Sequence, residues 1–121
     1  MRIAIPSGSD ELLNSQIFGH FGHAPYFTIA NVEDGAVSDA EAIKNVDHDE
    51  NGCGGVIQYL LGQNFDVLIV AGMGQRPAMA FGQAGVPIYF DQQSTTVGEA
   101  VERYLAGQLP QLSLDDACNH H

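Results

Sequence analysis

The segment from Phe18 to Phe27 carries the residues best suited to metal chemistry. His20 and His23 stand three positions apart, and two neutral imidazoles at that spacing offer nitrogen donors to a soft or borderline metal. Gly22 lies between them and lets the backbone turn sharply or approach a ligand. Because a His-x-x-His pattern outside a helix is a weak sign of a metal site, a loop with solvated histidines stays open as the alternative.

A glycine-rich segment, residues 51–55, is the second candidate, and we expect it to precede a helix that begins at Val56. Free amides at a helix start and the positive end of the helix dipole favour anions. Cys53 at such a position favours the thiolate, which is the form that binds metals. A flexible glycine turn is the alternative, since the lysine and hydroxyl of a phosphate-binding P-loop are missing. The glycines that would bind an anion here are Gly52, Gly54 and Gly55.

A third glycine turn, Gly72 to Gln75, follows an apolar strand and precedes a helix expected from Pro77. Gly74 would expose backbone amides at the start of this helix, and Arg76 either faces an anion or covers the helix end. A dinucleotide site is disfavoured, because the third glycine of that fingerprint is absent.

The last residues of the chain form a further group of soft ligands. Cys118, His120 and His121 offer one thiolate and two imidazoles, which is a half-site for zinc, copper or iron. A mobile tail is the alternative. With Cys53 as the other cysteine, a disulfide framework is excluded, and a thiol redox switch between Cys53 and Cys118 is a weaker possibility.

Charge and composition exclude several classes of function. The chain of 121 residues has 4 Lys+Arg against 15 Asp+Glu, a formal charge of -11, so it is not expected to bind nucleic acid or an anionic membrane surface. No apolar run approaches the roughly 20 residues of a membrane span, and the start is too short for a signal peptide, so a cytoplasmic location is expected. No catalytic triad or carboxylate pair is recognisable, and the acidic residues 47–50 lack EF-hand spacing. We therefore expect a protein that is not an enzyme.

The hydrophobic pattern predicts alternating strands and helices in a single domain. The connection at residues 7–24 is long for a compact domain, and such connections are often functional. Residues 67–71 are apolar on both faces, as in a central parallel strand. Thr96 and Glu99 have the form of a capping box, and Gly107 is a suitable helix stop. Strands are predicted at 2–6, 26–32, 36–46, 67–71 and 86–90, and helices from 56, at 77–84 and at 97–105.

This order predicts an α/β fold with three layers, α/β/α, around a five-stranded mixed sheet with one antiparallel strand. In such sheets ligands bind beyond the carboxyl ends of the strands. The loop 7–24, the turn 51–55 and the turn 72–76 all leave carboxyl ends. We therefore expect their histidines, glycines and cysteine to converge at one edge of the sheet.

At these residues the chain resembles the dinitrogenase iron-molybdenum cofactor biosynthesis family, which includes nitrogenase accessory factors and small stand-alone proteins of the orange-protein type. The resemblance covers about residues 1–107, with 108–121 as a C-terminal tail. The motifs that carry it are Arg2-Ile3-Ala4-Ile5-Pro6, His20-Phe21-Gly22-x-Ala24-Pro25-Tyr26-Phe27, the glycines 52–55, the segment 67–74, Ala84-Gly85-Val86 and Thr96-Val97-x-Glu99-Ala100.

The resemblance implies a ribonuclease H-like motif with strand 2 antiparallel, without nuclease activity. It also implies a binder or carrier of an iron–sulfur, iron–molybdenum or molybdenum–copper sulfide cluster, with donor and acceptor proteins as partners and His20 as a ligand. This chain departs from many stand-alone members in having His23 where they have arginine and Cys53 among its glycines. Both departures add soft ligands.

The hypothesis is a non-enzymatic metallocluster carrier, a monomer or a weak homo-oligomer. The resemblance implies nitrogen fixation as its context, and other metal handling stays open. The alternatives are a simple zinc or copper site in the tail and a regulatory module that docks on a partner without metal. For the cluster carrier, the predicted metal ligands are His20, His23 and Cys53, with Cys118, His120 and His121 as a closing arm. The predicted cofactor-binding residues are His20, Gly22, Gly52, Gly54, Gly55, Gly74 and Arg76.

Overall fold

The computed structural model describes residues 1–45 and 48–111, and for residues 48–54 it describes the backbone alone. Within this part, one five-stranded sheet has the order β3-β2-β1-β4-β5. Its strands are β1 (Arg2–Ser7), β2 (Tyr26–Glu33), β3 (Ala36–Lys44), β4 (Val67–Val70) and β5 (Ile88–Phe90), and the helices are α1 (His48–Leu61), α2 (Gln75–Gln83) and α3 (Val97–Leu105).

The strand directions confirm the predicted mixed sheet. β1 pairs with β4 and β4 pairs with β5 in parallel, whereas β2 runs antiparallel to both β1 and β3. All four residues of β4 are buried, as expected for a central strand covered on both faces. β3 lies at the sheet edge, in agreement with its poor hydrophobic alternation and its charged residues.

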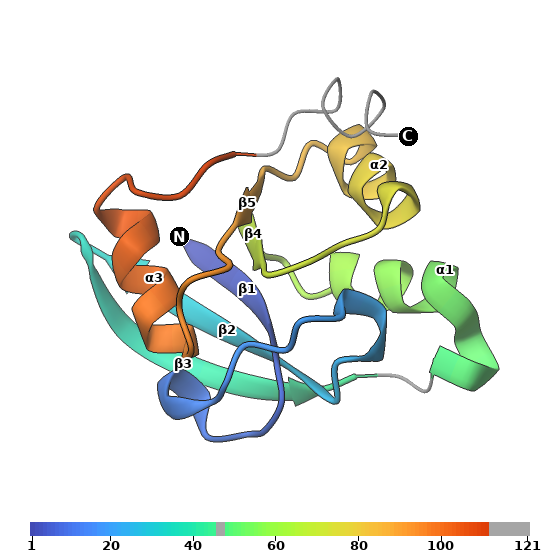
Figure 1. Cartoon of the computed structure of the whole chain (residues 1–121), viewed down its shortest axis with the longest axis horizontal. Helices are drawn as coiled ribbons and strands as arrows, with labels where there is room; N and C mark the ends of the chain where they lie inside the picture. The colour runs from blue at the N-terminus through green and yellow to red at the C-terminus, as the bar shows by residue number, and fades with distance from the viewer. Residues whose placement is uncertain (46–47, 112–121) are drawn as a thin grey trace.

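The helices form layers on the two faces of this sheet (Figure 1). On one face, Val56 and Leu60 of α1 and Phe81 of α2 are buried in one apolar cluster with residues of β1, β2, β4 and β5. On the opposite face, Val97 and Val101 of α3 are buried against β1, β2 and β4. Alternate residues of each strand therefore enter opposite cores, which is the α/β/α arrangement expected from the sequence.

Each helix is short and has one buried side. α1 has 14 residues, and α2 and α3 have 9 each. No helix in the described part of the chain combines the length and the apolar character needed to cross a bilayer. Their stability in this fold comes from packing one face on the sheet rather than from length.

The capping box at the start of α3 is present as predicted. The Thr96 side chain accepts a hydrogen bond from the Glu99 amide, and the Glu99 carboxylate accepts one from the Thr96 amide, both at 3.3 Å. At the other end, the φ of Gly107 is 73°, and its amide bonds to the Tyr104 carbonyl. Local sequence therefore fixes both ends of this helix.

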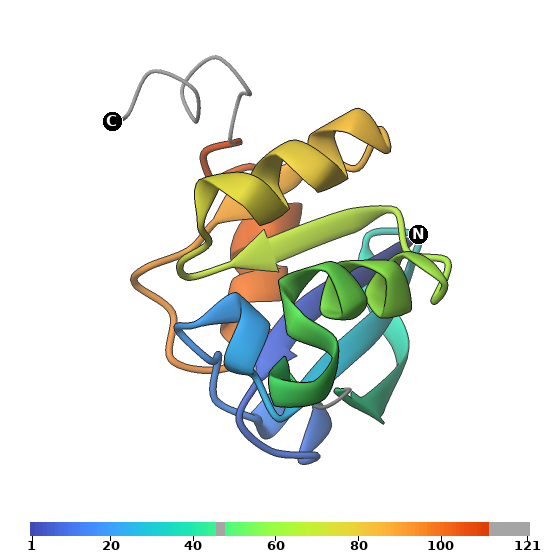
Figure 2. The same ribbon diagram turned by 90° about the vertical axis from the view of Figure 1, so that its right-hand side faces the viewer.

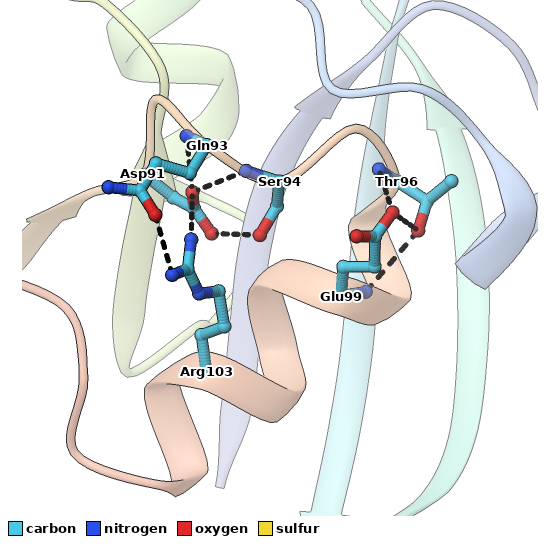
Figure 3. A network of polar contacts seen from close by, with 6 residues as sticks. All are labelled: Asp91, Gln93, Ser94, Thr96, Glu99 and Arg103. Atoms are coloured by element: carbon cyan, nitrogen blue, oxygen red, sulfur yellow. Dashed lines mark hydrogen bonds and ion pairs between the residues drawn. The ribbon is translucent and has the colours of Figure 1, made fainter.

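A buried carboxylate, Asp91, ties the loop before α3 to the end of that helix (Figure 3). Its Oδ1 accepts hydrogen bonds from the amides of Gln93 (3.0 Å) and Ser94 (2.8 Å), and its Oδ2 accepts one from the Ser94 hydroxyl. The guanidinium of Arg103 lies 3.6 Å from Oδ1. Burial alone raises the pKa of Asp91, but these hydrogen bonds and the Arg103 charge outweigh burial and hold its pKa below the ordinary value.

We expect Asp91→Asn to lower the free energy of unfolding at pH 7 by about 1–3 kcal/mol, because the amide keeps an acceptor but loses the charge. Since the folded-state pKa is lowered, the carboxylate stabilises the fold above the unfolded-state pKa of about 4, and this contribution is lost as the pH falls further. Urea unfolding of both proteins between pH 7 and pH 2.5 measures it. A stability difference that stays constant down to pH 2.5 would contradict the assignment.

The connection between β1 and β2 is more ordered than the sequence suggested. It holds two 3₁₀ turns, η1 (Leu12–Asn14) and η2 (Phe21–His23). Ser7 bridges to Ile17, and the Ser15 carbonyl accepts the amide of Val97 at 2.9 Å. Hydrogen bonds to β1 and to the start of α3 therefore hold a segment that lacks the periodicity of a regular element.

The structure corrects two predicted helix starts. α1 begins at His48 rather than at Val56, so the glycines 52–55 lie inside it. Val56, Ile57 and Leu60 of its later half are buried, and each residue added to an existing helix gains a backbone hydrogen bond, which offsets a glycine cost of roughly 1 kcal/mol per residue. α2 begins at Gln75, so Pro77 is its third residue; its missing N–H still costs nothing in the first turn.

Candidate functional site

Chain segments far apart in sequence meet at the carboxyl edge of the sheet, where the parallel strands β1, β4 and β5 end. Because β2 is antiparallel to β1, the end of β1 at Ser7 and the start of β2 at Tyr26 are paired neighbours. β4 runs parallel to β1, so its end at Val70 points to the same edge. The loop that carries the histidines and the turn after β4 therefore leave the sheet side by side, as Figure 2 shows. This is the edge at which ligands bind in open α/β sheets.

The two histidines of the loop lie next to each other. His20 precedes η2 and His23 is its last residue, and in a 3₁₀ turn side chains three positions apart lie on the same side. Their ring centroids are 4.6 Å apart, with the ring planes inclined at 49°. Both residues are exposed. The spacing seen in the sequence thus gives two adjacent imidazoles at the surface.

Phe21 anchors this histidine pair to the core. Its side chain is buried, and its ring lies 5.6 Å from that of Phe27 in β2 and 5.5 Å from that of Phe81 in α2. The contact with Phe81 is edge-to-face, which is a favourable geometry for aromatic pairs. The turn therefore exposes imidazoles on one side while its phenylalanine is fixed between the sheet and α2.

A pocket of about 350 Å³ lies where the loop and the turn meet. Its walls are residues 19–22, residues 72–74 and Pro77, so it includes His20, Gly22 and Gly74 from the predicted site. Phe21, Met73 and Pro77 supply apolar side chains. None of the described lining residues is acidic, although the chain as a whole carries a charge of -11.

The start of α2 forms part of the pocket wall. Gly74 is its N-cap and provides no side-chain acceptor, and its first turn contains no acidic residue. The first N–H groups of a helix lack partners within the helix, and the helix dipole is positive there. Arg76 is exposed in the same turn but does not line the pocket. The amide prediction for Gly74 thus has a structural basis, whereas a contact of Arg76 with a ligand stays a prediction.

The glycines of α1 have a different position from the one expected. Gly52, Gly54 and Gly55 lie within the helix, where a backbone N–H bonds to the carbonyl four residues earlier. They are therefore not a loop of free amides before a helix, and that reason for assigning them to an anion site is wrong. Their part in ligand binding remains a prediction without this basis.

Cys53 is in α1, which packs against η2. The helix follows the end of β3, which is at the same sheet edge as the histidine loop, so its first half lies toward that edge. A position for Cys53 near the histidines is thus compatible with the topology. The remaining predicted ligands, Cys118, His120 and His121, lie outside the described residues.

Sequence reasoning missed several residues that shape the site. Phe21 was seen only as part of a family motif, and Met73 and Pro77 only as parts of a turn and a helix start. A phenylalanine directly between the two histidines was the available signal for an anchor. Among the residues whose side chains are described, no group of three or more His, Cys, Asp or Glu is close enough to hold a metal ion. The two imidazoles of His20 and His23 are adjacent in this part of the chain, and their role as metal ligands stays a prediction.

Fold and site together define a class of small α/β/α protein with a pocket between two loops at the carboxyl edge of a mixed sheet. The family described as "Dinitrogenase iron-molybdenum cofactor" matches residues 1–107, and this chain belongs to that family. The resemblance drawn from the sequence motifs is therefore confirmed.

The chain is also similar to individual proteins over most of its length. The chain is 27% identical over 113 residues to an uncharacterized protein of Methanocaldococcus jannaschii. The aligned region covers 90% of this chain and 89% of that protein. It is similar to the apo form of the orange protein from Desulfovibrio gigas, with 27% identity, a TM-score of 0.79 and coverage of 93% and 92%. A candidate NifB protein from Thermotoga has 27% identity, a TM-score of 0.72 and coverage of 92% of both chains.

Proposed function

We propose that this protein is a non-catalytic accessory protein of metallocluster metabolism, and that residues 1–107 form the domain that binds and carries the cluster. The cargo would be an iron–sulfur, iron–molybdenum or molybdenum–copper sulfide cluster, passed between donor and acceptor proteins. The observation that carries the proposal is the pair of imidazoles 4.6 Å apart at a pocket of about 350 Å³. Membership of the dinitrogenase cofactor family supports the same chemistry.

The donor set suits a bulky anion that contains soft metals. Imidazole nitrogen binds iron and copper. His20 lines the pocket, and the ring of His23 lies beside the ring of His20. The helix end at Gly74 and a described lining without carboxylates suit the negative charge of sulfide-rich clusters. The acidic surface does not prevent this, because salt screens charges beyond about 8–10 Å.

The remaining ligands would come from α1, the C-terminal residues and the start of α2. Cys53 would supply a thiolate from α1, the helix that packs against η2. Cys118, His120 and His121 would form a closing arm. Gly22 and Gly74 would allow close approach of the cluster, and Arg76 would add positive charge at the start of α2.

Anaerobic reconstitution with ferrous iron, sulfide and molybdate tests the proposal. After desalting, the wild-type protein should keep visible absorption bands, and the His20→Ala/Cys53→Ala double variant should lose them. Gln58→Ala, at an exposed position on α1, is the control and should keep the bands. Wild-type protein that stays colourless with only trace metal would contradict cluster binding. Bound zinc or copper without sulfide would instead indicate the simple metal site.

A further inference from the structure

The backbone at Gly72 leaves no room for a side chain. A Cβ atom built on this residue would lie 2.9 Å from the carbonyl oxygen of Gly19, closer than real Cβ atoms approach other atoms. The neighbour is backbone, so it cannot move aside as a flexible side chain would. Gly74, in the same turn, differs: its Cβ would meet only Pro77 at 3.7 Å, which is ordinary contact.

This close approach joins the two walls of the pocket. Gly72 belongs to the turn after β4, and Gly19 immediately precedes His20 in the histidine loop. The loop is also fixed on its other side, since Phe21 is buried between Phe27 and Phe81. His20 thus stands between an aromatic anchor and a backbone contact. A shift at Gly19 must move the His20 backbone or strain the anchor.

We propose that Gly72 is a positioning residue for the histidine pair: its missing side chain lets the Gly19 carbonyl close onto the turn and sets where His20 stands relative to His23 and the start of α2. Any residue other than glycine would move the carbonyl outward and open the pocket wall. The consequence for cargo rests on the proposed cluster binding, whereas the placement of the imidazoles does not depend on it.

The expected effect of Gly72→Ala on cluster retention follows from the narrow range of metal–ligand distances that a metal site tolerates. Metal–ligand distances in working sites fall within about 0.2 Å of their ideal values. Relief of a contact at 2.9 Å requires a displacement of several tenths of an ångström, to reach an ordinary distance. Residues that orient metal ligands typically change metal affinity by roughly 10–100-fold when mutated. Gly72→Ala should therefore weaken cluster retention at least about 10-fold.

The test compares Gly72→Ala with Gly62→Ala and wild type. Gly62 follows α1, next to Gln63, whose carbonyl contacts Arg2 at the start of β1, the opposite end of that strand from the histidine loop. Its Cβ would meet the Tyr59 carbonyl oxygen at an ordinary 3.4 Å. Proton–carbon NMR spectra of the imidazoles, with assignments from His20→Ala and His23→Ala, report ring placement. We expect the signals of both rings to move in Gly72→Ala and to stay unchanged in Gly62→Ala. Reconstitution with ferrous iron, sulfide and molybdate should give correspondingly weaker bands for Gly72→Ala alone.

Imidazole signals of folded Gly72→Ala at wild-type positions would overturn the inference. If Gly72→Ala does not fold, a crystal structure of the wild-type protein decides: the inference predicts the Gly19 carbonyl oxygen within about 3 Å of a Cβ atom built on Gly72, and ordinary van der Waals separation there would overturn it. If wild type takes up no cluster while the ring signals move as expected, the proposed function fails and the positioning role stands.

Discussion

Phe21→Ala is expected to lower the free energy of unfolding by about 3–5 kcal/mol, the usual cost of deleting a buried phenylalanine ring. The side chain is 3% exposed, and its ring contacts Phe27 and Phe81, so its removal leaves a cavity between the sheet and α2. Urea unfolding followed by circular dichroism measures the loss. Because the ring also anchors η2, the imidazole signals of His20 and His23 should change in the same variant.

Phe65→Ala is the matched control for this substitution. Phe65 is half-buried, and its ring centroid lies 6.2 Å from that of Phe81. It belongs to the segment before β4 and not to the histidine loop. Phe65→Ala should lower the free energy of unfolding less than Phe21→Ala does, because Phe65 buries less apolar area. It should also leave the signals of both imidazoles in place. Equal losses for both variants, with unmoved imidazole signals in Phe21→Ala, would show that Phe21 does not hold the turn.

The second large effect concerns the individual ligands. His20→Ala should remove most of the visible absorption after reconstitution, because His20 lines the pocket. His23→Ala should remove less, since its ring lies beside His20 but does not line the pocket. Both substitutions concern exposed residues, so unfolding free energies should change by only about 0.5 kcal/mol.

A truncation after Leu114 distinguishes the pocket from the tail. It removes Cys118, His120 and His121 together. If the pocket holds the cluster and the tail only closes over it, the truncated protein keeps its bands and loses them more quickly on dilution. Loss of all metal on truncation, with full retention in His20→Ala, would place the site in the tail instead.

Most of the fold follows from local sequence rules. The fully apolar run 67–70 became an interior strand of the sheet, and Thr96 with Glu99 formed the predicted cap. The order of the elements then left few possible topologies, with one antiparallel strand, and the family resemblance placed that strand at β2. The extent of α1 could not be predicted in this way, because glycine has low helix propensity and the packing of Val56 and Leu60 overrides it.

The site was predictable in its location more than in its construction. The rule that ligands bind at carboxyl edges placed the histidine loop and the turn 72–74 together, and the spacing of His20 and His23 suggested a pair. The contact between Gly72 and Gly19 joins residues distant in sequence, and no local pattern encodes it. The same holds for Phe21 against Phe81, which depends on how α2 packs on the sheet.

Analysis of metals and acid-labile sulfide in protein isolated without oxygen tests cluster carriage most directly. The proposal predicts iron or molybdenum together with sulfide in fixed proportion to the wild-type chain, and their loss from the His20→Ala/Cys53→Ala variant. Metal without sulfide, or the same metal and sulfide content in both proteins, would contradict it.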